Sequence, residues 1–394
     1  MFSSAETAAR SALERFVRSS ADPRPALDAA LADDPDYVPA HLLRAGMAVA
    51  AKDRAAFGAL DESLAALARL GPGLSERERF HCDAALAWRA GEHARAAAAY
   101  ADIARRWPHD LLAIRLAQSC FFMLGQPDAM LAVTAGALPR WRDGTPGFDA
   151  LLALHAFALD ESGDCVRAEG AARRALAIEP ANPCAIHAVA HALDGREPGR
   201  RGLAWLESRA GDWAGDGAMT SHNGWHLALA HLALGRPERS LAVYDAKLAP
   251  ALERIGADAM DAAALLWRLE LQGVAVGARW RAVAVAFALR PQPSLWPLVD
   301  VHAGTAFVAA GRARELDRLW VKLAGGHGVA REVAAPVVRA IQAFGASDYT
   351  EAAAMLAPLA GQSWRLGGSF VQREIVALTL EVARRRATRL VRAA

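Results

Sequence analysis

The stretch AFALDESGDCVRAEGAARRALAIEP, from Ala156 to Pro180, decides the fold class of this chain of 394 residues. It reads as two helices joined at Gly163, followed by a proline that ends the second helix. Ala168, Ala172 and Ala175 fall on one face of the second helix. Because alanine at a helix crossing lets two axes come close, this stretch predicts a tight helical hairpin.

The same frame of small residues, glycine and a closing proline recurs along the chain. One copy runs through Ala84, Gly91, Ala96, Tyr100, Ile103 and Pro108, and another through Ala228, Gly235, Ser240 and Tyr244 to Pro250. Gly91 and Gly125 stand 34 residues apart, as do Gly311 and Gly345. The inter-helix glycines, each expected at the end of a first helix, are Gly91, Gly125, Gly163, Gly195, Gly235, Gly311 and Gly345. A period near 34 is typical of tetratricopeptide repeats, which are helical hairpins.

Strand patterns are almost absent, so the sequence predicts an all-α fold, an α-α superhelix of stacked hairpins. We expect one continuous solenoid over residues 1–394. It comprises an N-terminal helical cap region (1–75), tetratricopeptide-like repeats (76–360) and a C-terminal capping helix (361–394). A break at residues 291–293 is too short to separate domains. The expected helix pairs are 39–70, 77–106, 110–138, 147–177, 181–211, 219–254, 258–290, 296–324 and 330–360.

Composition narrows the class of function. The net charge is +2, from 45 basic and 43 acidic residues, which predicts no nucleic-acid partner. The sequence shows no signal peptide and no long apolar segment, so we expect no membrane partner. Its four cysteines form no CxxC motif and suit a reducing compartment, so we expect a cytoplasmic protein. The oligomeric state stays open.

Two histidine pairs with identical spacing are the main functional signal. His187 and His191 stand four apart in IHAVAH, and His222 and His226 stand four apart in SHNGWH. Side chains at i and i+4 share one helix face, and the two pairs fall on first helices of adjacent hairpins. Such pairs suit a divalent metal, or acid–base chemistry near neutral pH. Glu161, Asp194 and Asp300 are candidate carboxylate partners.

Core packing explains part of this pattern equally well. His155, His187 and His191 fall on positions that are usually core in the repeat frame, where a hydrogen bond to a neighbour suffices. No HExxH signature is present, so the sequence assigns no metal ligand and no cofactor, and a divalent metal remains a lesser alternative.

Further candidates lie downstream. His302 follows Asp300 by two residues in VDVHAG, on a later first helix. The segment LGGSFVQRE opens the last helix, where Ser369 is a good N-cap and Arg373 lies one turn in. An ordinary capped helix is the alternative interpretation of this segment.

Several of these motifs together resemble the tetratricopeptide repeat protein 38 family. The similarity runs from about residue 80 to residue 385 and rests on HAVAH, HNGWH, DVHAG and LGGSFVQRE in that order. It implies a tetratricopeptide α-solenoid and supplies no reaction. The residues that match the motif stretches are His187, His191, His222, Asn223, Trp225, His226, Asp300, His302, Gly368, Ser369, Gln372 and Arg373. The chain departs from the family pattern in HALDGRE, which weakens the case for Asp194.

We therefore expect a tetratricopeptide-repeat protein that binds a small polar ligand or a short peptide in a concave pocket. The candidate ligand-binding residues are His187, His191, His222, Asn223, His226, Asp300, His302, Ser369, Gln372 and Arg373. Arg373 is expected to clamp a carboxylate or phosphate. The alternatives are an enzyme that uses the same histidines in hydrolase- or lyase-type chemistry, and a plain protein–protein scaffold. The sequence assigns no catalytic residue.

Overall fold

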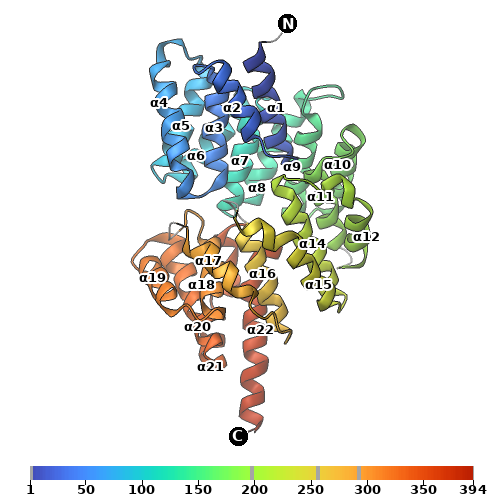
Figure 1. The fold of residues 1–394 in the computed structure, drawn as a ribbon, viewed down its shortest axis with the longest axis vertical. Coiled ribbons are helices and arrows are strands. Elements are labelled where there is room, and N and C mark those ends of the chain that lie inside the picture. The colour runs from blue at the N-terminus through green and yellow to red at the C-terminus, as the bar shows by residue number, and fades with distance from the viewer. Residues whose placement is uncertain (1–2, 196–198, 254–257, 291–293, 394) are drawn as a thin grey trace. The chain divides into compact units, whose positions relative to one another are not determined.

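The computed structural model describes residues 3–195, 199–253, 258–290 and 294–393, and within these ranges the chain is helical without strands. The prediction of an all-α fold is confirmed (Figure 1). The helices divide into two compact units, which we describe separately. Unit 1 comprises residues 1–52, 56–122 and 126–234, and unit 2 comprises residues 53–55, 123–125 and 235–394. The single solenoid stays a prediction, and the break predicted at residues 291–293 lies outside the described residues.

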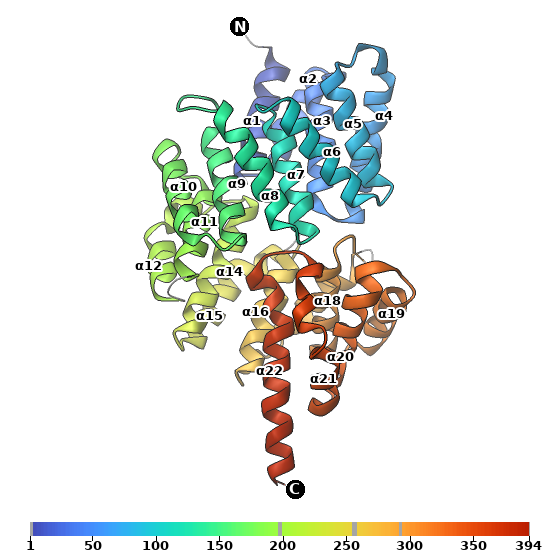
Figure 2. The same cartoon turned by 180° about the vertical axis from the view of Figure 1, so that it is seen from behind.

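Unit 1 is built from consecutive helices that pack side by side (Figure 2). Its α-helices are α1 (Ser4–Arg18), α2 (Arg24–Asp33), α3 (Val38–Ala51), α4 (Phe57–Arg69), α5 (Glu76–Arg89), α6 (His93–Arg106), α7 (Leu111–Met123), α8 (Pro127–Ala137), α9 (Phe148–Glu161), α10 (Cys165–Ile178), α11 (Pro183–Asp194), α12 (Arg200–Ser208), α13 (Ala210–Trp213) and α14 (Ala218–Ala233). Short 3-10 turns cover Gly71–Gly73 and Leu138–Arg140, and a third, Arg54–Ala56, begins in residues assigned to unit 2. Hairpin partners such as α3 and α4 contact each other, and so do successive first helices such as α9 and α11.

Unit 2 contains α15 (Pro237–Val243), α16 (Asp258–Leu271), α17 (Arg279–Ala288), α18 (Pro297–Ala309), α19 (Ala313–Ala324), α20 (Ala335–Gly345), α21 (Tyr349–Leu356) and α22 (Phe370–Ala393). Single π-helical turns cover Tyr244–Leu248 and Ala330–Ala334, and 3-10 turns cover Ala249–Glu253 and Ala360–Leu366. The long helix α22 packs against α16, α20 and α21. The division between the units falls inside the helix pair predicted at 219–254, because α14 belongs to unit 1 and α15 to unit 2.

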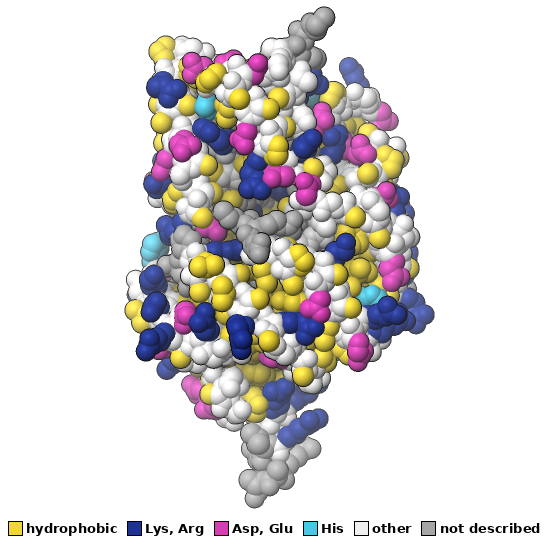
Figure 3. All heavy atoms as spheres, viewed as in Figure 1, with side chains coloured by type: hydrophobic (Ala, Val, Ile, Leu, Met, Phe, Trp, Pro, Cys, Tyr) yellow, Lys and Arg dark blue, Asp and Glu magenta, His cyan; other side chains and the backbone are white. Residues whose placement is uncertain are grey.

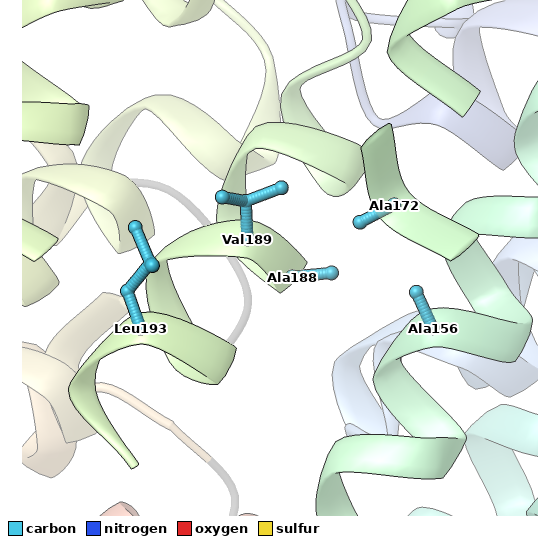
Figure 4. Close-up of a cluster of buried hydrophobic side chains, with 5 residues drawn as sticks. All are labelled: Ala156, Ala172, Ala188, Val189 and Leu193. Atoms are coloured by element: carbon cyan, nitrogen blue, oxygen red, sulfur yellow. The ribbon is translucent and has the colours of Figure 1, made fainter. Parts of the chain in front are cut away.

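Alanines form the helix crossings, as the repeat frame predicts. Figure 4 shows Ala156 of α9, Ala172 of α10 and Ala188 of α11 as members of one buried cluster with Val189 and Leu193. Each of the three alanines has no exposed surface, so a larger side chain at any of them would force the helices apart.

Five of the seven frame glycines adopt the left-handed conformation that ends a helix, with φ between 66° and 87° at Gly91, Gly125, Gly163, Gly235 and Gly311. The expectation fails at Gly195 and Gly345. Gly195 has a helical φ of −61°, and Gly345 is the last residue of α20. There Ser347 takes the left-handed position, with φ 64°. Gly345 serves close packing instead, because a Cβ there would lie 2.3 Å from Val308 Cγ1.

On the face in Figure 3, basic, acidic and apolar side chains are interspersed. In the described part of the chain, no helix is both long enough and apolar enough to cross a membrane.

Candidate metal centre

Helices α11 and α14 of unit 1 carry the two histidine pairs and pack against each other. Asn182 sets the start of α11, because its side-chain oxygen accepts a hydrogen bond from Ala185 N at 3.1 Å. Asn223 of α14 donates from Nδ2 to the carbonyl of Pro183 at 3.3 Å. These two buried amides fix where α11 begins and how α14 lies against it.

Three of the four histidines converge. His226 Nε2 lies 3.2 Å from His187 Nε2 and 3.1 Å from His191 Nε2, and all three side chains are buried. Metal bonds of about 2.0–2.1 Å at tetrahedral angles place two nitrogen ligands about 3.3–3.4 Å apart. The two distances from His226 Nε2 are therefore close to the spacing that a single bound ion requires, and ligand atoms of the three rings all lie within 4.8 Å of one another.

Asp160 of α9 orients one of these rings. His191 Nδ1 lies 3.1 Å from Asp160 Oδ2, which places the ring proton on Nδ1 and leaves the lone pair of Nε2 facing the other histidines. Burial lowers the pKa of His191, but the hydrogen bond and charge of Asp160, with Glu161 and Asp194 nearby, outweigh it and raise the pKa. A carboxylate behind a histidine is the usual support of a metal-binding imidazole.

In neutral rings, the three converging Nε2 atoms carry more lone pairs than protons. With the His191 proton on Nδ1, its Nε2 offers only a lone pair, and each other Nε2 carries either one proton or one lone pair. At most one proton fits between the three nitrogen atoms, so at least two lone pairs face each other. Burial, with the charges of His191 and His222, holds the pKa of His187 well below its usual range, so this ring stays neutral and able to bind a cation.

His222, the fourth histidine, flanks the group without joining it. Its ring centroid lies 4.8 Å from that of His187 and 5.0 Å from that of His226, and the ring stacks on Trp225 at 5.4 Å. His222 is half-buried, whereas the three converging rings are buried. It therefore lies at the more accessible edge of the cluster. Phe157 packs against His187 and His191 with centroid separations of 5.6 Å and 5.7 Å.

The other predicted site residues lie in unit 2, where their polar atoms bond within the fold. Asp300 Oδ1 accepts from Ser294 N at 2.8 Å, ahead of α18. Burial raises the Asp300 pKa to about 7, against the lowering effect of the Ser294 hydrogen bonds. His302 Nδ1 donates to the carbonyl of Leu298 at 2.9 Å, whereas its Nε2 is buried and has no partner in the part of the chain that the structure describes. Burial lowers the His302 pKa to about 4.

The segment before α22 forms a capped helix start. Ser369 Oγ accepts from Gln372 N at 3.2 Å, and Gln372 Oε1 accepts from Ser369 N at 3.1 Å, so the two form a capping box. Gln372 also donates to Asp261 Oδ1 at 3.2 Å, and Arg373 donates to the carbonyl of Gly368. Their assignment as ligand-binding residues remains a prediction, since these bonds suit a structural role.

The structure thus brings together His187, His191 and His226, with His222 and Asn223 beside them, in unit 1. Asp300, His302, Ser369, Gln372 and Arg373 lie in unit 2. The sequence interpretation missed Asp160 and named Glu161 and Asp194 instead. The repeat frame could have indicated the contact between Asp160 and His191. Asp160 precedes Gly163 by three residues and His191 precedes Gly195 by four, so the two residues occupy similar heights on adjacent first helices. No model of a known protein family matches the sequence.

Proposed function

We propose that this protein binds one divalent transition-metal ion of the zinc class through His187, His191 and His226. The observation that carries the proposal is the convergence of three buried Nε2 atoms at 3.1 Å and 3.2 Å, with Asp160 behind one of them. Imidazole nitrogens suit zinc, copper, iron and nickel better than magnesium or calcium.

Three protein ligands favour a catalytic rather than a structural centre. Structural zinc sites are closed by four protein ligands, whereas catalytic sites have three and leave a position for a small molecule. We propose that a small polar ligand with an oxygen donor binds at this position, beside His222. The ion would act there as a Lewis acid in hydrolase-type chemistry. This agrees with the alternative of an enzyme that uses these histidines.

The proposal also includes the repeat class of the protein and its cellular compartment. The resemblance to the tetratricopeptide repeat protein 38 family and the stacked hairpins support a tetratricopeptide-like repeat protein. Cys82, Cys120 and Cys184 are free thiols, which supports a reducing, cytoplasmic compartment.

Metal analysis tests the binding step directly. The full chain is produced in zinc-supplied medium, freed of any affinity tag, and analysed by plasma mass spectrometry. We expect about one ion per chain in the wild type and none in the His187→Ala/His226→Ala double variant. His155→Gln is the matched control, because His155 is also buried in unit 1 but bonds Thr134 at 3.0 Å. A wild-type protein without transition metal would sink the proposal.

A second experiment tests chemistry. The metal-free and zinc-loaded proteins are assayed on chromogenic esters, phosphoesters and amides. Hydrolysis that appears only with zinc, and that is lost in the double variant, supports an enzyme. If the protein binds the metal but hydrolyses none of these substrates, the result supports metal-dependent ligand binding and contradicts the proposal of a hydrolase.

A further inference from the structure

Unit 1 contains a second feature that the metal proposal does not use, a cavity of about 270 Å³. It lies among α1, α3, α5 and α7 and the loop that ends at Gly147, and none of the four clustered histidines lines it. Its volume is near the lower end of ligand pockets, which span about 300–1,000 Å³. A cavity of this size fits a small molecule and not a folded partner.

The floor and one wall of the cavity are apolar. Leucines from three helices form the floor, Leu13 of α1, Leu42 and Leu43 of α3, and Leu111 and Leu112 of α7. The Trp141 ring forms part of the wall, held by a bond from its Nε1 to the carbonyl of Pro108 and by the His109 ring at 5.0 Å. Gly147 keeps space open, because a Cβ there would lie 2.7 Å from Leu111 Cδ2. These surfaces suit a flat, apolar molecular body.

The buried carboxylates around the cavity are already saturated. Asp110 accepts bonds from His81 Nε2 at 2.9 Å, Arg77 Nη1 at 3.1 Å and Ala113 N at 2.9 Å. Asp149, which holds Arg18 in a bidentate pair at 2.7 Å and 2.9 Å, also accepts from Asn182. Burial raises the Asp110 pKa, but His81, Ala113 N and Arg77 together lower it, so the group stays ionised. These oxygens have little capacity left to bind a ligand's donors.

The donors are not saturated. Arg77 lines the cavity and its side chain is 43% exposed. Of its five N–H groups, only one on Nη1 bonds within the described residues, to Asp110. Tyr37 also lines the cavity. The guanidinium of Arg18 also lines the cavity, but it is held by Asp149. Arg77 is therefore the cavity-lining cation with N–H groups left for a ligand.

We infer that this cavity binds a small organic carboxylate with a flat apolar body. The carboxylate accepts charge-assisted hydrogen bonds from Arg77, and the apolar body lies between the leucine floor and Trp141. This site is separate from the metal centre, and its inference does not depend on the metal proposal.

Ligand-detected NMR and calorimetry on the full chain test the inference with three probes that share one ring, namely benzoate, benzamide and benzylamine. We expect benzoate to bind with a Kd of about a millimolar or below and the amide and amine to bind at least about tenfold more weakly. Arg77→Gln should weaken benzoate binding about tenfold, which is the loss expected of a charged hydrogen bond. Arg105→Gln, an exposed arginine on α6 that does not line the cavity, is the matched control.

Leu13→Trp provides a second variant, because Leu13 is half-buried at the cavity and a larger ring there fills the space. It should abolish benzoate binding in a protein with an unchanged helical spectrum. The His187→Ala/His226→Ala variant should bind benzoate like the wild type, which separates this cavity from the metal centre. Equal binding of the three probes, no binding of benzoate at about 10 mM, or binding that survives Leu13→Trp would overturn the inference.

Discussion

The histidine cluster of unit 1 and the surroundings of His302 in unit 2 both place buried histidines on first helices of hairpins, yet they differ in what the rings face. In the cluster, three Nε2 atoms face one another across two helices. His302 instead bonds a carbonyl of its own helix, and its ring is isolated enough for burial to lower its pKa to about 4. Burial of a histidine therefore does not mark a site, whereas convergence of several lone pairs does.

The largest expected effect separates these two regions directly. His226→Ala removes the nitrogen atom that both other rings contact, so we expect metal affinity to fall at least about a thousandfold. His302→Ala should leave metal affinity unchanged and lower the free energy of unfolding by about 2–4 kcal/mol, because it empties a buried position. Competition with a chelating dye measures affinity, and urea unfolding measures stability. The comparison breaks down if the two variants lose metal to the same extent.

A smaller effect is expected at Asp160. Asp160→Asn keeps the shape but removes the charge behind His191, so metal affinity should fall about 10- to 100-fold. Asp164→Asn, in the exposed N-cap of α10, is the matched control. Both variants are measured by the same dye competition. An affinity of Asp160→Asn within a factor of two of the wild type would show that Asp160 does not support the centre.

The helix pairs and the histidine pairs could be predicted from local sequence patterns. Helical periodicity and the alanine–glycine–proline frame are local, so they gave the helix pairs to within a few residues; at 148–178, for example, the pair was expected at 147–177. The pairing of His187 with His191 is equally local, because i and i+4 share a helix face.

The convergence itself was not predictable from one helix. It depends on the offset between α11 and α14, and the bond from Asn223 to the carbonyl of Pro183 that joins these helices spans 40 residues of sequence. Asp160 was missed because it reaches His191 from the preceding hairpin. Gly195 and Gly345 departed from the frame because packing distance, rather than a left-handed φ, decides a glycine where a Cβ would meet Cys165 or Val308.

The polar residues of unit 2 give a prediction on pH. The folded Asp300 holds its proton to about pH 7, while the unfolded carboxyl loses it near 3.8, so the folded state binds more protons in this window. The free energy of unfolding contributed by Asp300 should therefore fall as the pH rises from 4 to 7, by up to about 4 kcal/mol. Urea unfolding of the wild type and Asp300→Asn at pH 5 and pH 8 measures it. Equal pH dependence in both proteins would contradict the assignment.

The smallest effect concerns the start of α22, where the sequence predicts a capping Ser369 near Arg373. Ser369→Ala removes the capping hydroxyl of α22 and should cost about 1 kcal/mol of unfolding free energy, with metal affinity unchanged. Ser3→Ala, which removes the N-cap of α1, is a matched change in unit 1 and should cost a similar amount. Urea unfolding compares the two variants. A loss of metal from Ser369→Ala would contradict a purely structural role of Ser369.

The most direct test of the central claim is anomalous diffraction from crystals of the protein grown with zinc, recorded on both sides of the zinc absorption edge. We expect one strong peak about 2.0–2.2 Å from Nε2 of His187, His191 and His226, with Asp160 still bonded to His191 Nδ1. A map without a peak between these three nitrogen atoms, from protein exposed to excess zinc, would contradict the account.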